Sequence, residues 1–422
     1  MTPHVLSNGL RVHLAPSHGT GAVTFLVLTK VGSRYEYEAI NGASHFIEHL
    51  MFKGTKRHPS TAQITRMLDA VGASYNAYTG KDVTGYHITI AAEHLPMAID
   101  LLHDMLFHSL YKKEEVDRER GVIIEEINMY RDNPMMHVEE LMEQAMFPGN
   151  TLGWDIAGDE KRMRTMTREA VVAYRDAHYI PSRMVVAVAG KVPENALALV
   201  KKTFGTVKPA KQEPDPFAPF APRAFGSTPV FVQNKPTKQI QVAMGFYSYG
   251  LEDARNPATS LLANILGGTM SSRLFIQVRE RKGLCYFVRA SNSPYEETGV
   301  FAIQSGLDRS RLPLAMKTIR EEIRKIKKQG VTAKELREAR ENIRGRLLLR
   351  LEDSSEQAEW WAKQELFLGR VKSFEMRMKE FAKVTPKEVQ KVANEILDDK
   401  RMGIGAVGPF KDGKAFMKAA GF

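Results

Sequence analysis

The chain has 422 residues, 43% of them hydrophobic and 26% charged, which are globular proportions and exclude a disordered or fibrous protein. This length exceeds one ordinary domain, so we expect two. The net charge of +11 would suit a nucleic-acid-binding protein, but Lys and Arg are dispersed among Glu along helical stretches, which indicates a solvated surface.

No stretch approaches the roughly 20 consecutive apolar residues of a membrane-spanning helix. Residues 1–10 lack the basic and then apolar pattern of a secretory signal. The single cysteine, Cys285, excludes an internal disulfide and is typical of a reducing compartment. We therefore expect a soluble, cytoplasmic protein that binds neither membranes nor nucleic acid.

Both halves of the chain mix strands with helices. Short or alternating apolar runs predict strands at 22–29, 83–91, 184–189, 239–245, 299–305 and 403–407. Spacing of 3.6 residues predicts helices at 61–71, 95–107, 113–131, 312–329 and 333–351. Because the two kinds do not alternate strictly, we expect α+β domains, each a largely antiparallel sheet covered by helices.

The two halves also resemble each other, which indicates a duplication. An apolar run at 43–51 leads into Gly54-Thr55, and a run at 258–266 leads into Gly268-Thr269. Closing strands of the form Arg-Met followed by small and apolar residues occur near the end of each half.

A segment with six prolines, 207–229, divides the halves and predicts an extended linker. We therefore predict an N-terminal domain at 1–207, a Pro-rich linker at 208–229 and a homologous C-terminal domain at 230–422.

His45 and His49 lie four residues apart in a run that we expect to be helical. This spacing places both imidazoles on one helix face, where they can share a metal ion, with Glu48 beside them. The order His-x-x-Glu-His is a known catalytic motif. The alternative is two histidines that are merely packed or exposed. All twelve histidines lie between His4 and His178, so the C-terminal half contributes none.

A catalytic zinc needs a third protein ligand. The predicted helix 113–131 carries Glu119 and Glu126, seven residues apart and therefore on one face. Glu125 competes with Glu126, and all of these acids could instead be solvated surface groups.

These motifs resemble the pitrilysin-type, or inverzincin, zinc metallopeptidases, which include insulysin and the mitochondrial processing peptidase. The resemblance covers nearly the whole chain. It implies that His45, His49 and Glu126 hold one Zn²⁺ per chain and that Glu48 is the general base. It also implies that Glu119 orients a ligand from outside the coordination sphere.

The same resemblance assigns roles to two further regions. Arg279 and Tyr286, seven residues apart, match a family pair that holds the substrate carbonyl, a role suited to a cation and a phenol. Residues 74–79 match the family's edge strand, and Asn76 and Ala77 are expected to bind an extended peptide through its main chain. An ordinary surface strand is the alternative for this segment.

The function that follows is a zinc-dependent endopeptidase acting on flexible or unfolded peptides. A chain of this length resembles the family's two-domain branch, whose subunits pair as a closed chamber. Because this chain carries both the zinc motif and the Arg/Tyr pair, we expect a homodimer. The alternative is a non-catalytic assembly or core subunit with the same fold, although such relatives typically lack a ligand or the base.

Two other patterns are discounted. Residues 403–408 match Gly-x-Gly-x-x-Gly, but Pro409 and the nearby C-terminus leave no room for the βαβ unit of a dinucleotide site. Cys285 is an unsuitable nucleophile because its half of the chain has no histidine to activate it.

Overall fold

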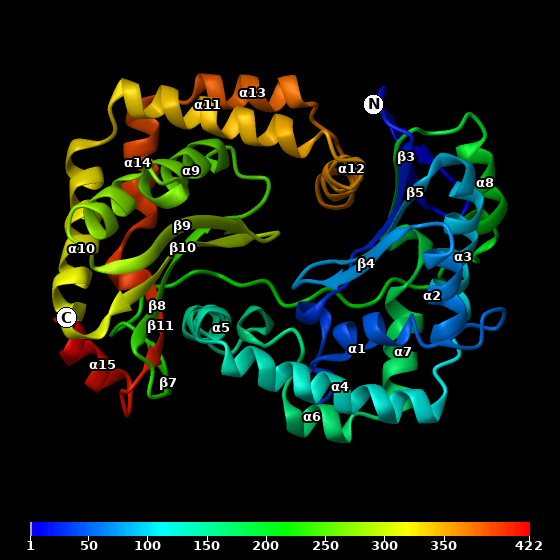
Figure 1. Cartoon of the computed structure of the whole chain (residues 1–422), viewed down its shortest axis with the longest axis horizontal. Coiled ribbons are helices and arrows are strands. Elements are labelled where there is room, and N and C mark those ends of the chain that lie inside the picture. The colour runs from blue at the N-terminus through cyan, green and yellow to red at the C-terminus, as the bar shows by residue number, and fades with distance from the viewer. Residues whose placement is uncertain (1) are drawn as a thin grey trace. The chain divides into compact units, whose positions relative to one another are not determined.

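The computed structural model describes residues 2–422, and the chain forms two compact units. Unit 1 contains the N-terminal segment through Ile127 together with Trp154–Phe217 and Leu347–Lys372. Unit 2 contains Asn128–Gly153, Ala218–Arg346 and Ser373–Phe422. Figure 1 labels the helices and strands used below.

Unit 1 is built on a six-stranded sheet with the order β1-β2-β6-β3-β5-β4. Only β2 and β6 are parallel, and the other neighbours are antiparallel. The strands are β1 (His4–Val5), β2 (Arg11–Pro16), β3 (Ala22–Thr29), β4 (Ser74–Thr79), β5 (Thr84–Ala91) and β6 (Met184–Gly190). The predicted α+β class with a largely antiparallel sheet is confirmed.

Helices cover both faces of this sheet, as the alternation along β3 requires. Val23, Phe25 and Val27 face the main core. Leu26 and Leu28 belong to a second cluster on the opposite face, with α12 (Ser354–Leu368). The other helices that lie in unit 1, wholly or for most of their length, are α1 (Ala43–Leu50), α2 (Thr61–Asp69), α3 (Leu95–His108), α4 (Lys113–Asp132), α6 (Glu160–Thr165), α7 (Arg168–His178) and α8 (Ala196–Thr203).

Unit 2 repeats the topology of unit 1, and this supports the predicted duplication. Its sheet has the order β7-β11-β8-β10-β9, with β7 and β11 parallel. This order matches β2-β6-β3-β5-β4. The strands are β7 (Val230–Asn234), β8 (Gln239–Tyr249), β9 (Cys285–Pro294), β10 (Thr298–Asp308) and β11 (Met402–Gly408). The motif at 403–408 therefore lies within a sheet strand and opens no nucleotide-binding loop.

The helices of unit 2 include two π-helical turns, η7 (Asn264–Gly268) and η8 (Phe275–Glu280). Its α-helices are α5 (Pro134–Met146), α9 (Asn256–Ala263), α10 (Leu312–Gln329), α11 (Ala333–Arg350, most of it in this unit), α13 (Phe374–Lys383), α14 (Pro386–Ile396) and α15 (Gly413–Ala420). Residues 207–229 contain neither helix nor strand.

The compact units differ from the predicted boundaries because each half gives one helix to the other unit. Helix α5 comes from the N-terminal half but packs on β8 and β11 of unit 2. Helix α12 comes from the C-terminal half but packs on the sheet of unit 1. His137, on α5, is consequently a residue of unit 2.

Small residues explain why these two helices lie so close to their sheets. A Cβ added at Gly405 of β11 would lie 2.3 Å from the carbonyl oxygen of Val138 on α5. On the other sheet, Ala358 and Ala362 of α12 pack in one cluster with Ala187 and Ala189 of β6. Side chains this short let a helix backbone approach the sheet surface.

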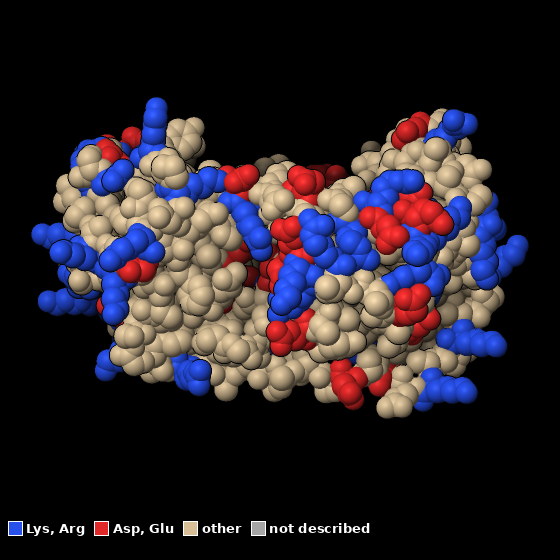
Figure 2. All heavy atoms as spheres, turned by 90° about the horizontal axis from the view of Figure 1, so that it is seen from below, with Lys and Arg blue, Asp and Glu red and all other residues tan. Residues whose placement is uncertain are grey.

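Charged side chains of both signs share the surface. Figure 2 shows Lys and Arg interspersed with Asp and Glu on the visible face. Among the described residues, no helix combines the length and the apolar composition that crossing a membrane requires.

Replacing Gly405 by Ala tests the close packing of α5. The added methyl group must displace α5, so we expect a loss of about 1–3 kcal/mol in stability and a lower denaturation midpoint. Gly345→Ala, on α11 with open space around it, is the matched control and is expected to be neutral or stabilising by up to about 1 kcal/mol. Equal midpoints for the Gly405 variant and the native chain would contradict the packing account.

Candidate metal centre

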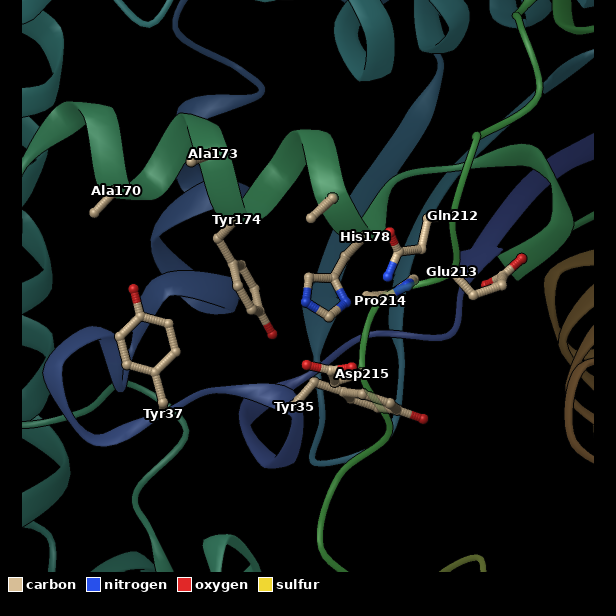
Figure 3. Close-up of a pocket in the computed structure, with 11 residues that line it drawn as sticks. Tyr35, Tyr37, Ala170, Ala173, Tyr174, His178, Gln212, Glu213, Pro214 and Asp215 are labelled. Carbon is tan, nitrogen blue, oxygen red and sulfur yellow. The ribbon is translucent and has the colours of Figure 1, made fainter.

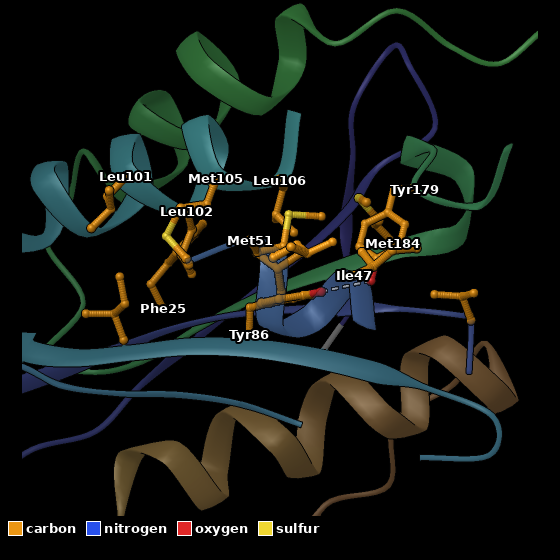
Figure 4. Packing of buried hydrophobic residues seen from close by; sticks show 14 of the residues in the cluster. Phe25, Ile47, Met51, Tyr86, Leu101, Leu102, Met105, Leu106, Tyr179 and Met184 are labelled. Carbon is orange, nitrogen blue, oxygen red and sulfur yellow. Dashed lines mark hydrogen bonds between the residues drawn. The ribbon is translucent and has the colours of Figure 1, made fainter. Parts of the chain in front are cut away.

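Helix α1 is fixed by one apolar face, and its polar face carries the motif. Phe46, Ile47, Leu50 and Met51 are at most 1% exposed. Figure 4 shows Ile47 and Met51 packed in the core beneath α3 and beside the hydrogen-bonded hydroxyls of Tyr86 and Tyr179. Because side chains three and four apart share a helix face, His45, Glu48 and His49 emerge together on the other side.

The N-terminus of α1 is capped by a buried carboxylate. Gly42 has φ of +102°, and a Cβ there would lie 2.6 Å from the carbonyl oxygen of Ala157, so glycine is required. Glu36 accepts hydrogen bonds from the backbone N–H groups of Gly42 (2.8 Å) and Ser44 (2.7 Å). Burial raises the pKa of Glu36 to about 7, although these hydrogen bonds oppose the shift. This cap holds the first turn of the motif helix.

Helix α4 presents its two spaced glutamates toward α1. Ile123 and Ile127 are at most 1% exposed and anchor this part of the helix in the core. Glu119 is buried, Glu126 is half-buried and Glu125 is exposed. Of the two adjacent glutamates between which the sequence left the choice open, Glu126 and not Glu125 lies beside the imidazoles.

The donor atoms of His45, His49 and Glu126 converge. The two Nε2 atoms are 3.2 Å apart, and Oε2 of Glu126 lies 3.4 Å from Nε2 of His49 and 3.8 Å from Nε2 of His45. Tetrahedral zinc with bonds of about 2.0–2.1 Å separates its ligands by about 3.3 Å. Two imidazole nitrogens and one carboxylate oxygen at these separations fit a zinc ion that keeps its fourth position open.

Glu119 orients one of these imidazoles. Its Oε1 lies 2.9 Å from Nδ1 of His49, and its Oε2 lies 2.6 Å from Nζ of Lys53. A carboxylate on Nδ1 directs the lone pair of Nε2 toward the metal position. Among residues 2–422, Nδ1 of His45 has no such partner.

Without a metal, the pKa values of the two imidazoles are shifted in opposite directions. Burial would lower the pKa of His49, but hydrogen bonds to Glu119 and Glu126 outweigh it and raise the value to about 9. Burial and the neighbouring His49 lower the pKa of His45 to about 4. A metal that binds here must displace the proton of His49, so protons compete with the metal.

Glu48 stands outside this donor set. Its Oε2 accepts a hydrogen bond of 2.6 Å from the hydroxyl of Thr79 at the end of β4. Burial raises the pKa of Glu48, while Thr79 and His49 oppose the shift. A carboxylate with a raised pKa beside a metal position is suited to accept a proton.

Arg279 and Tyr286 lie in unit 2 and are neighbours of each other. Arg279 is on the π-helical turn η8, and its guanidinium lies 4.8 Å from the ring centroid of Phe275 and 5.9 Å from that of Tyr286. Tyr286, on β9, is 72% exposed.

The thiol of Cys285 has its pKa raised to about 11 by burial, so it is protonated at neutral pH and a poor nucleophile.

Asn76 and Ala77 lie on β4, the last strand of the unit 1 sheet. Strand β4 pairs with β5, opposing Asn76 to His87 and Ala77 to Tyr86, and within the described sheet no strand pairs with its other edge. An unpaired edge offers main-chain groups to an extended peptide.

A separate pocket of about 530 Å³ lies elsewhere in unit 1 and contains none of the predicted site residues (Figure 3). Tyr35, Tyr174 and His178 line it together with residues 212–215 of the linker. Burial and the nearby Arg183 lower the pKa of His178 to about 4, so this imidazole is neutral at physiological pH. Its lining includes no second imidazole, and the group of possible metal donors found among the described residues is His45, His49 and Glu126, which lies outside this pocket.

Sequence reasoning missed two contributors to the metal centre, Glu36 and Thr79. Glu36 precedes the motif helix, but nothing in the residue pattern distinguishes a capping carboxylate from a surface one. Thr79 lies 31 residues from Glu48, and only the sheet brings the two together.

The comparisons with known proteins define the class. The model of the insulinase family (peptidase family M16) matches residues 11–160, and the model described as the peptidase M16 inactive domain matches residues 165–343. The chain belongs to the M16 peptidase family, and the predicted membership of the pitrilysin-type group is confirmed.

Individual relatives are similar over at least 90% of their length. An uncharacterized zinc protease of Streptomyces coelicolor is 36% identical, covering 97% of this chain and 90% of the relative. The uncharacterized zinc protease YmxG of Bacillus subtilis is 34% identical, covering 94% and 95%. A crystal structure of a protease from Helicobacter pylori has a TM-score of 0.90 at 23% identity, covering 97% of this chain and 100% of that one, and this shows a shared fold.

The pair of neighbouring carboxylates on α4 provides a test of the donor set. We expect Glu126→Gln to weaken zinc binding by more than the about 10- to 100-fold that follows loss of an outer hydrogen-bond partner. Glu125→Gln, which removes the adjacent exposed carboxylate, is expected to bind zinc as the native chain does. Competition with a chromophoric chelator measures both, and equal losses in the two variants would exclude Glu126 as the third ligand.

Proposed function

We propose that this chain is a zinc metalloendopeptidase that binds one Zn²⁺ through His45, His49 and Glu126. The observation that carries the proposal is the convergence of two imidazoles and one carboxylate at 3.2–3.8 Å, with the carboxylate of Glu48 near enough to interact electrostatically with His49 and Glu126. The relatives named as zinc proteases support the same function.

Each residue of the proposed site has its own role in peptide hydrolysis. Zinc, when bound, supplies Lewis acidity that polarises a peptide carbonyl and makes water a stronger nucleophile. Glu48 takes the proton from the attacking water and delivers it to the amine that leaves. Arg279 and Tyr286 donate hydrogen bonds to the oxyanion that develops on the attacked carbonyl. Glu119 keeps the imidazole of His49 oriented. No covalent intermediate with the protein forms.

The proposed substrates are flexible or unfolded peptides. An extended peptide adds to the free edge of β4 at Asn76 and Ala77, and main-chain pairing of this kind accepts many side-chain sequences. We further propose that two copies of the chain pair as a homodimer that encloses a chamber, which admits flexible chains and excludes folded proteins.

A non-catalytic assembly or core subunit is the rival function. It predicts the same fold and allows metal binding, but it predicts no hydrolysis. The peptidase is favoured because His45, His49, Glu126 and Glu48 are all present. One variant distinguishes the two functions.

Replacing Glu48 by Gln removes the base and keeps the shape of the side chain. We expect zinc content equal to that of the native chain and a loss of about 100- to 10,000-fold in kcat for an unstructured fluorogenic peptide, since general-base catalysis contributes about this much. Glu352→Gln, an exposed carboxylate of unit 1, is the control and should leave turnover unchanged.

Three outcomes are informative. Equal turnover by the Glu48 variant and the native chain would remove Glu48 from the mechanism. Absence of turnover in the native zinc-loaded chain would favour the non-catalytic subunit. Loss of zinc together with turnover in the variant would mean that Glu48 is a ligand.

A further inference from the structure

The hydroxyl of Thr79 holds one oxygen of the proposed base. Its Oγ1 donates a hydrogen bond of 2.6 Å to Oε2 of Glu48. Within residues 2–422, Oε1 of Glu48 has no hydrogen-bond partner. A hydroxyl that donates to one carboxylate oxygen leaves the other free to receive a proton, and it restricts rotation of the carboxylate plane.

The backbone of Thr79 is fixed independently of this contact. Thr79 pairs with Thr84 at the end of the β4–β5 ladder. Because consecutive residues of a strand point to opposite faces, Tyr78 points away from α1 and toward α12. Its hydroxyl donates to both carboxylate oxygens of Glu359 on α12, at 2.5 and 2.7 Å. The strand end is thus held from the far face of the sheet while Thr79 reaches α1.

The same strand offers its other edge to a peptide under the function proposed above. Asn76 and Ala77, the expected main-chain partners of the peptide, lie three and two residues before Thr79 on β4. One short strand therefore carries both the peptide-pairing edge and the hydroxyl that contacts the base. A displacement of the strand end would be transmitted to the carboxylate of Glu48.

We propose that Thr79 is a positioning residue that fixes the carboxylate of Glu48 in register with a peptide paired on β4. This inference rests on the proposed function. Thr79 does not itself touch the reacting atoms, so its loss should slow turnover without weakening peptide binding. In a merely structural role the hydroxyl would only satisfy a half-buried carboxylate. Its loss would then change the stability of the chain and leave both kcat and KM at their native values.

Three variants of the full-length, zinc-loaded chain test the proposal. Thr79→Val keeps the side-chain shape but removes the hydroxyl, and we expect kcat to fall about 10- to 100-fold with KM unchanged, the range for a hydrogen bond to a charged group. Thr79→Ser restores the hydroxyl and should recover most of the turnover. Thr89→Val, on β5 of the same sheet, removes a hydroxyl that bonds Thr24 and serves as the matched control with native kinetics. Zinc content should be equal in all of them.

A native kcat for Thr79→Val, or an equal fall for Thr89→Val, would overturn the proposal. A second readout keeps the test independent of hydrolysis: urea unfolding of Thr79→Val, Glu48→Ala and the double variant. If the native chain shows no turnover that depends on Glu48, the proposed function fails. The double-mutant cycle of unfolding midpoints then decides by itself whether Thr79 holds Glu48. Non-additive midpoints support the contact, whereas additive midpoints overturn it.

Discussion

The candidate metal centre depends on the convergence of two Nε2 atoms from α1 with one carboxylate oxygen from α4. Without a metal, burial disfavours a proton on His49, but hydrogen bonds to the carboxylates of Glu119 and Glu126 outweigh this and raise the pKa of His49 to about 9. Such closeness persists because both helices are locked by their apolar faces, and because Glu36 caps α1. The fold thereby holds these donor atoms at separations that fit a metal ion.

The two units share one strand order but carry different functional residues. Both units have the same strand order, including the one parallel pair, so the sheet and its helices do not require the metal ligands. In unit 2 the run at 258–266, matched to the motif run, carries no histidine, and it passes from α9 into the π-helical turn η7. Unit 2 instead carries the neighbouring Arg279 and Tyr286. One copy keeps the metal donors and the other keeps a cation and a phenol.

The sequence predicted those features that local spacing determines. The strand at 22–29 and the helix at 312–329 have the predicted bounds, because an apolar period is visible within each segment. Spacing could not choose between Glu125 and Glu126, which are adjacent, and the family resemblance or the structure was needed. The exchange of α5 and α12 was missed because the partner of a helix face depends on distant small residues such as Gly405. The contact of Thr79 with Glu48 has the same non-local origin.

X-ray absorption spectroscopy of the zinc-loaded native chain tests the central claim most directly. The account predicts a four-coordinate ion with two imidazole nitrogens at about 2.0–2.1 Å and oxygen ligands at about 2.0–2.2 Å. A shell that contains thiolate sulfur at about 2.3 Å, for which Cys285 is the single cysteine of the chain, would contradict it. So would a spectrum without the scattering of two imidazole rings.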